Sequence, residues 1–112
     1  MNLMLKFTAV AAVMSLFALP ALAADITSYD ITIKNHKFEP STVTIPADTK
    51  VKLNVKNADA TPEEFESHDL SREKIIPGNS QAVIMVGPLK KGTYKFFGEF
   101  NQATAQGQIV VQ

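Results

Sequence analysis

The side chains best suited to chemistry are crowded into one short stretch, residues 61–74 (TPEEFESHDLSREK), which holds Glu63, Glu64, Glu66 and His68 within six positions. On an extended strand Glu64 and Glu66 share one face, with His68 next in line, whereas Glu63 points to the other face. Carboxylates placed in this way repel one another unless a cation or a proton lies between them. Oxygen-rich sites that include an imidazole suit iron, manganese, copper(II) or zinc. The stretch therefore predicts a metal site.

A second interpretation of the same stretch is a charge-rich loop that is simply solvated, with Arg72 and Lys74 as loose ion-pair partners. The spacing E-x-E-x-H does not by itself diagnose any one kind of site. Phe65 favours the metal interpretation, because a large apolar residue among carboxylates indicates a strand with one buried face. Such a strand would fix where the neighbouring side chains point. Both interpretations stay open at this point.

Two further candidate ligands lie outside this stretch. Glu99 belongs to residues 95–107 (KFFGEFNQATAQG), in a tract otherwise aromatic and small, where a buried carboxylate would need a partner. His36 precedes Lys37 in another polar segment, and its plainer interpretation is a polar side chain at a strand end. We expect residues 61–74 and 95–107 to form two loops at one end of the domain, where they would meet and hold an ion.

The rest of the chain predicts the strands that would position these residues. Apolar residues alternate with polar ones along residues 29–34 and 50–56, the period of a half-buried strand. Turn signals recur roughly every 8–12 residues, and no long helix is indicated. The pattern predicts one all-β sandwich of about seven short strands, the others falling at residues 42–45, 72–76, 81–86, 94–97 and 108–111.

The first 23 residues have the composition of an export signal. Lys6 supplies the positive charge, residues 7–22 are apolar, and Ala21-Leu22-Ala23 fits the rule of small residues at a cleavage site. The apolar run falls short of the ~20 residues that span a bilayer. We therefore expect cleavage after Ala23, a signal peptide over residues 1–23 and a single exported domain over residues 24–112.

Composition excludes several classes of function. Without Lys6, 10 of the 11 basic residues remain against 11 acidic ones, and this balance argues against a nucleic-acid partner, which would require a basic face. The chain has no cysteine. Cysteine nucleophiles, cysteine-based zinc sites and thiolate-bound copper are therefore excluded.

Residues 38–48 (FEPSTVTIPAD) and 51–57 resemble the first half of a cupredoxin domain, and Tyr94-x-Phe96 with residues 107–111 (GQIVV) resembles its end. The resemblance implies a single antiparallel Greek-key β-sandwich of the cupredoxin type. In blue-copper members the end carries a Cys-x-x-His-x-x-Met loop. Here Gly98 stands where the Cys would be, Asn101 where the His would be, and Thr104 or Ala105 near the Met; the upstream copper histidine corresponds to Glu63 or Glu64. The resemblance thus implies no type 1 blue copper site.

A closer resemblance is to cysteine-less, cupredoxin-like periplasmic proteins that accompany bacterial high-affinity ferrous-iron permeases. It implies that the protein binds a copper or iron ion and assists iron uptake, with Fe(II) oxidation as a further step. The implied partners are an iron permease or a periplasmic iron-binding protein, with the membrane reached only through a partner. Relatives commonly have histidine where this chain has Asn101; if that histidine is a ligand, the site here is weaker or altered, and oxidation is affected more than binding. The shared segments are HKF (36–38), DATPEEFES (59–67), DLxREK (69–74), VGPL (86–89), GTYKFFGEF (92–100) and TAQG (104–107).

The sequence thus leads to two hypotheses. In the first, the domain is a periplasmic metal-binding accessory whose candidate ligands are Glu64, Glu66, His36, Glu99, His68 and Glu63. In the second, it is a metal-free docking module for a permease or periplasmic binding protein, with the acidic residues as a rim. Ligand carboxylates should converge on one point, whereas a docking loop would leave them spread in solvent.

Overall fold

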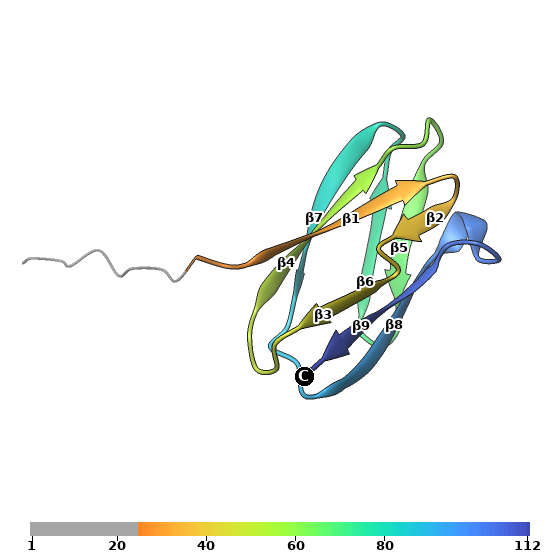
Figure 1. The fold of residues 1–112 in the computed structure, drawn as a ribbon. Helices are drawn as coiled ribbons and strands as arrows, with labels where there is room; N and C mark the ends of the chain where they lie inside the picture. The colour runs from red at the N-terminus through yellow and green to blue at the C-terminus, as the bar shows by residue number, and fades with distance from the viewer. Residues whose placement is uncertain (1–24) are drawn as a thin grey trace, which may run out of the picture.

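The computed structural model describes residues 25–112, and the signal peptide expected over residues 1–23 lies outside this range. The described strands form two layers (Figure 1). One sheet has the order β2-β1-β4-β7 and the other the order β3-β9-β8-β5-β6. The elements are β1 (Ser28–Lys34), β2 (Lys37–Glu39), β3 (Thr42–Ile45), β4 (Val51–Asn57), β5 (Glu63–Ser67), β6 (Arg72–Ile76), β7 (Ser80–Val86), β8 (Gly92–Gly98), the 3₁₀ helix η1 (Glu99–Asn101) and β9 (Gln106–Val111).

The core lies between the two sheets and follows the alternation seen in the sequence. Ile31 and Ile33 of β1 and Leu53 of β4 are fully buried, while the residues between them are partly or fully exposed. Burying each such side chain stabilises the fold by about 1.5–3 kcal/mol before the loss of conformational entropy is counted. The predicted sandwich is confirmed, with one common hydrophobic core.

Three aromatic rings join the sheets and fix the orientation of β5. Phe65 of β5 stacks on Phe96 of β8 with ring centroids 4.9 Å apart, and both rings meet Phe38 of β2 edge-on at 6.1 and 5.0 Å. Because alternate residues of a strand point to opposite faces, an inward Phe65 turns Glu64 and Glu66 to the outer face of the second sheet. This packing therefore decides where the candidate ligands lie.

The resemblance implied an antiparallel sandwich, and the structure differs in that each of the two sheets is mixed. β1 pairs with β4 in parallel and β3 pairs with β9 in parallel, whereas the other pairings are antiparallel. Parallel pairs require a crossover connection, so strand partners far apart in the sequence are brought together. Within residues 25–112, no helix is long and apolar enough to cross a membrane.

The expectation of two loops at one end of the sandwich is wrong. Residues 63–67 form β5, an inner strand of the second sheet paired with both β6 and β8. Residues 95–98 complete β8, and only η1 and the residues up to β9 connect the strands. The acidic segment is a strand because its inward residues bury apolar surface and its backbone bonds to two neighbours. The burial of apolar surface and the backbone hydrogen bonds outweigh the low strand propensity of glutamate.

Candidate metal centre

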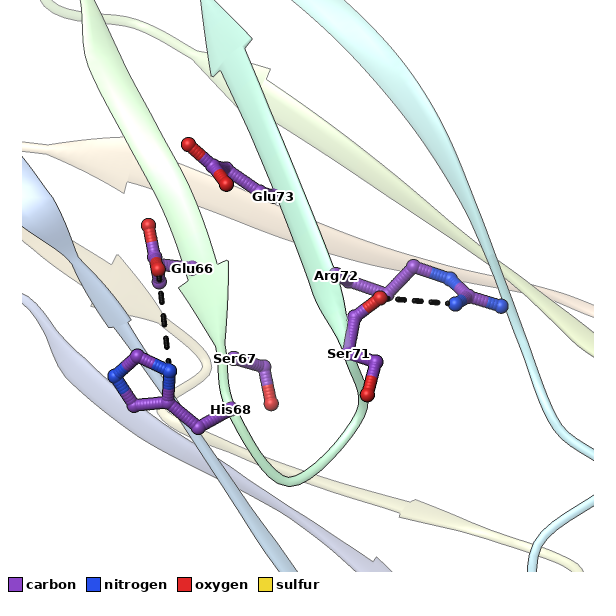
Figure 2. Close-up of a pocket in the computed structure, with 6 residues that line it drawn as sticks. All are labelled: Glu66, Ser67, His68, Ser71, Arg72 and Glu73. Carbon is purple, nitrogen blue, oxygen red and sulfur yellow. Dashed lines mark hydrogen bonds and ion pairs between the residues drawn. The ribbon is translucent and has the colours of Figure 1, made fainter.

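Three carboxylates converge on the outer face of the second sheet. Glu64 and Glu66 of β5 and Glu73 of β6 each offer a carboxylate oxygen, and these atoms all lie within 4.8 Å of one another. Glu66 and Glu73 are direct cross-strand partners, and Glu64 lies diagonally to Glu73 because it pairs with Ile75. Figure 2 shows the Glu66 and Glu73 side chains extending from neighbouring strands. We call these three residues the carboxylate cluster.

The cluster confirms one expectation and adds one residue. The predicted sharing of a face by Glu64 and Glu66, with Glu63 on the other, is what the strand provides. Glu73 was not among the candidate ligands from the sequence. The signal that could have found it is the β5–β6 hairpin, whose register places Glu73 opposite Glu66.

Glu64 is the member of the cluster whose environment is least favourable for a bare charge. The residue is only 7% exposed, and its polar neighbours Glu66 and Glu73 are themselves carboxylates. Among residues 25–112, no N–H or O–H group of another type donates a hydrogen bond to its carboxylate. Hydrogen bonding to Glu73, burial and the adjacent Glu66 raise the pKa of Glu64 to about 7. At neutral pH the cluster therefore favours a proton or a cation between its oxygens.

The cations that the sequence offered as partners are directed elsewhere. Arg72 donates from Nε to the carbonyl oxygen of Met85, 2.9 Å away on β7, and from a terminal nitrogen to the carbonyl of Ser71. Figure 2 shows its guanidinium turned away from Glu66 and Glu73. Lys74 follows Glu73 on β6, so it points to the opposite side of the sheet. Within residues 25–112, neither Arg72 nor Lys74 forms an ion pair with the cluster, so the interpretation as a solvated loop with these two ion pairs does not hold.

His68 stands beside the cluster at the end of β5. Its Nδ1 lies 4.0 Å from Oε1 of Glu66, and its side chain is 80% exposed. The imidazole ring packs obliquely against Phe97, with centroids 5.5 Å apart. Together with Glu66 and Glu73 it borders an open pocket of ≈ 310 Å³, whose remaining lining residues are Ser67, Ser71 and Arg72 (Figure 2).

Glu63 lies on the inner side of β5 and has its own partners. It is 1% exposed; Oε1 accepts hydrogen bonds from the backbone nitrogens of Phe100 (2.9 Å) and Glu64 (3.1 Å), and Oε2 accepts one from Nδ2 of Asn101 (2.6 Å). Residues 61–74 and 95–107 therefore do meet, but here through hydrogen bonds to a carboxylate. A Cβ added at Gly98 would lie 2.7 Å from Cδ of Glu63, which explains why glycine occupies that position.

The remaining two candidates lie apart from the cluster. Glu99 is exposed on η1, and His36 is exposed in the turn between β1 and β2. Asn35 and His36 have φ values of 52° and 58°, and their backbone nitrogens donate to the two carboxylate oxygens of Asp59 over 2.8 and 2.9 Å. The three-carboxylate group found within residues 25–112 includes neither Glu99 nor His36.

Comparisons with known proteins agree with this architecture. A family model described as a cupredoxin-like domain matches residues 7–111. An uncharacterized protein of Rickettsia prowazekii (strain Madrid E) is 53% identical over 87 residues, covering 78% of this chain and 70% of that protein.

Solved structures share the fold at low identity. The metal-binding domain of the Streptococcus pneumoniae D39 Cu(I)-exporting P-type ATPase CopA has a TM-score of 0.68 at 14% identity, covering 76% of this chain and 84% of the other. Auracyanin A, a "blue" copper protein from Chloroflexus aurantiacus, has a TM-score of 0.68 at 16% identity, covering 79% and 100%. The purple cupredoxin from Nitrosopumilus maritimus has a TM-score of 0.58 at 19% identity, covering 79% and 100%.

These neighbours establish the fold, and the family match extends over nearly the whole chain. The chain has no cysteine, so it has no thiolate that could bind copper. The protein belongs to the cupredoxin-like domain family.

Proposed function

We propose that this protein is a periplasmic metal-binding accessory of a ferrous-iron uptake system, and that it binds an iron or copper ion between Glu64, Glu66 and Glu73. The observation that carries the proposal is the convergence of these three carboxylates, with Glu64, a residue only 7% exposed, facing two carboxylates and no donor of another type within residues 25–112. An ionised carboxylate in such a place is costly unless a positive charge accompanies it. A cation supplies that charge, in competition with the proton that the raised pKa of Glu64 retains.

The donor set bears on the kind of ion. Carboxylate oxygens stabilise Fe(III) relative to Fe(II), and so lower the reduction potential of a bound iron and favour its oxidation. Oxidation of Fe(II) releases one electron, and a Cu(II) ion would be a suitable acceptor. Binding requires only the cluster, whereas oxidation requires that acceptor as well. We therefore place binding first and oxidation as a further step.

The cellular setting rests on the leader and on the resemblance described above. An export signal over residues 1–23 would deliver residues 24–112 to the periplasm. There the partner would be an iron permease or a periplasmic iron-binding protein, and the membrane would be reached only through that partner. The outer face of the second sheet would be the side that exchanges the ion, because Glu66 and Glu73 line the open pocket there (Figure 2).

The proposal is tested by calorimetric titration of residues 24–112, stripped with chelator, with Cu(II) and, under anaerobic conditions, with Fe(II). We expect a dissociation constant of about 1 μM or less, weakened at least about tenfold in Glu66→Gln and Glu73→Gln. Glu99→Gln is the matched control, because Glu99 is an exposed carboxylate on η1. Absence of binding in the wild-type chain, or equal weakening in all three variants, would overturn the proposal.

A metal-free docking module is the second candidate function, and one observation favours it. Phe100 is 50% exposed although it is aromatic, and its backbone nitrogen is held by Glu63. An exposed ring on a fixed backbone is suited to contact with another protein. Under this alternative Phe100→Ala would abolish capture of a permease or binding-protein partner, while Glu66→Gln would leave it unchanged.

A further inference from the structure

We propose that His68 is the fourth ligand of the carboxylate cluster, so that the ion is held by three carboxylate oxygens and one imidazole nitrogen. This inference rests on the proposed metal site and names one more ligand and the class of ion that the site accepts. It begins from position: His68 follows β5 on the side of Glu66, and its Nδ1 lies 4.0 Å from Oε1 of that carboxylate.

The backbone that carries His68 is held firmly. Ser67 donates from Oγ to the carbonyl oxygen of Lys95 over 2.6 Å, and the same Oγ accepts a hydrogen bond from the backbone nitrogen of Leu70 over 3.0 Å. Asp69 accepts a hydrogen bond from the backbone nitrogen of Lys95 over 2.8 Å. Side chains on both sides of His68 thus bond both polar groups of the Lys95 backbone, where β5 has stopped pairing with β8. The Cα of His68 is therefore fixed relative to the second sheet.

The imidazole itself remains adjustable. Its side chain is 80% exposed, and its ring centroid lies 5.5 Å from that of Phe97. Adjacent ligands of a bound ion lie about 3 Å apart when each is 2.0–2.2 Å from the metal. His68 is not among the side chains whose ligand atoms already lie within 4.8 Å of one another, so its imidazole must move toward Glu64 and Glu73 as well as toward Glu66. Rotation about the side-chain torsions of an exposed histidine can supply this movement.

The resulting donor set defines the class of ion. Three carboxylates and one neutral imidazole suit divalent or trivalent iron, manganese, zinc and Cu(II). Cu(I) prefers thiolate and thioether ligands, and the cluster offers neither. The site is thus expected to take oxygen-preferring and borderline cations and to bind Cu(I) weakly.

The chain provides a clean test because it has only two histidines, His36 and His68. Residues 24–112 would be labelled with ¹⁵N-histidine and loaded with one equivalent of Cu(II), and the nitrogen couplings would be read by pulsed electron paramagnetic resonance. His68→Ala and the matched control His36→Ala would be measured with Glu66→Gln. Both histidines are exposed, so the thermal melt of His68→Ala should match that of the wild type. His36 has a φ of 58°, which alanine adopts less readily, so His36→Ala should melt cooperatively at a slightly lower Tm, which shows that the fold is retained.

We expect coupling to one histidine nitrogen in the wild type and in His36→Ala, its loss in His68→Ala, and about tenfold weaker Cu(II) binding in His68→Ala. Cu(II) binding that depends on Glu66 but shows no such coupling, or a coupling lost in His36→Ala instead, would overturn this inference and leave the carboxylate site standing. Cu(II) binding that is unchanged in Glu66→Gln, or absent from the wild type, would overturn both proposals.

Discussion

The side-chain amide of Asn101 donates a hydrogen bond of 2.6 Å to Oε2 of the buried Glu63. This contact joins η1 to β5 and, with the backbone nitrogens of Phe100 and Glu64, surrounds the Glu63 carboxylate with donors. Glu64, its neighbour in sequence, points to the other face of β5 and finds carboxylates there instead. Two adjacent glutamates on one strand are thus placed in opposite environments, and only the environment of Glu64 favours a proton or a cation.

Asn101→Ala should destabilise the protein without affecting metal binding. The substitution removes a donor to a buried carboxylate, which costs about 2 kcal/mol, or a fall of roughly 10 °C in Tm for a domain of this size. Thermal melts and a Cu(II) titration of the same preparation check both parts. Loss of metal affinity in a folded Asn101→Ala protein would show that the η1 end takes part in the site.

Gly98→Ala should be destabilising for a steric reason. The added Cβ would lie 2.7 Å from Cδ of Glu63 and 2.7 Å from Cβ of Ala105, and both of those residues are buried. Overpacking of this kind costs about 1–3 kcal/mol. Chemical denaturation of Gly98→Ala and the wild type measures the change. Equal stability of Gly98→Ala and the wild type would contradict the packing described around Glu63.

The metal-free protein should lose stability as the pH rises from about 5 to about 8. The folded state raises the pKa of Glu64 from 4.5 to about 7, so in this interval the folded protein binds more protons than the unfolded chain, and raising the pH favours unfolding. Glu64→Gln should flatten this dependence and raise Tm at pH 8, while abolishing metal binding. Melts at several pH values, with Glu99→Gln alongside, provide the measurement. A Glu64→Gln protein that is less stable than the wild type at pH 8 would refute the assigned environment.

The contribution of Asp59 to the stability of the folded state should increase with pH, opposite to that of Glu64. The hydrogen bond from the His36 backbone is the main cause that lowers the pKa of Asp59 below 3.8, and the bond from Asn35 adds to it. A carboxyl group with a lowered folded pKa stabilises the protein above its unfolded pKa, and this contribution is lost as the pH falls through the folded value. Asp59→Ala should cost about 1 kcal/mol at pH 7, allowing for solvent screening, and less at pH 2. An equal cost at both pH values would show that the charge plays no part.

The strands with strict alternation were predictable from the sequence, and β1 and β4 lie where residues 29–34 and 50–56 indicated. β5 was indicated only by Phe65, and its segment was otherwise expected to be a loop, because the stability of β5 comes from Phe65 packing on Phe96 and from two neighbouring strands, which are contacts distant in sequence. The parallel pairings of β1 with β4 and of β3 with β9 likewise depend on crossovers that alternation does not encode.

The candidate site was predictable only in part. The shared face of Glu64 and Glu66 follows from the period of a strand. Glu73 joins Glu64 and Glu66 because the register of the β5–β6 hairpin places it opposite Glu66. The turn between these strands ends at Ser71, which has a φ of 53°. Two of the three donors to the Glu63 carboxylate come from η1, more than thirty residues away, and no local pattern indicates them.

The central claim is that an ion binds on the outer face of the second sheet, and paramagnetic NMR locates it most directly. Residues 24–112, labelled with ¹⁵N, would be titrated with substoichiometric Mn(II), which broadens the amide signals nearest to it. The account predicts that the amides of Glu64, Glu66 and Glu73 broaden first, and that the broadening disappears in Glu66→Gln. Broadening centred on the His36 turn or on η1, or none at all, would contradict it.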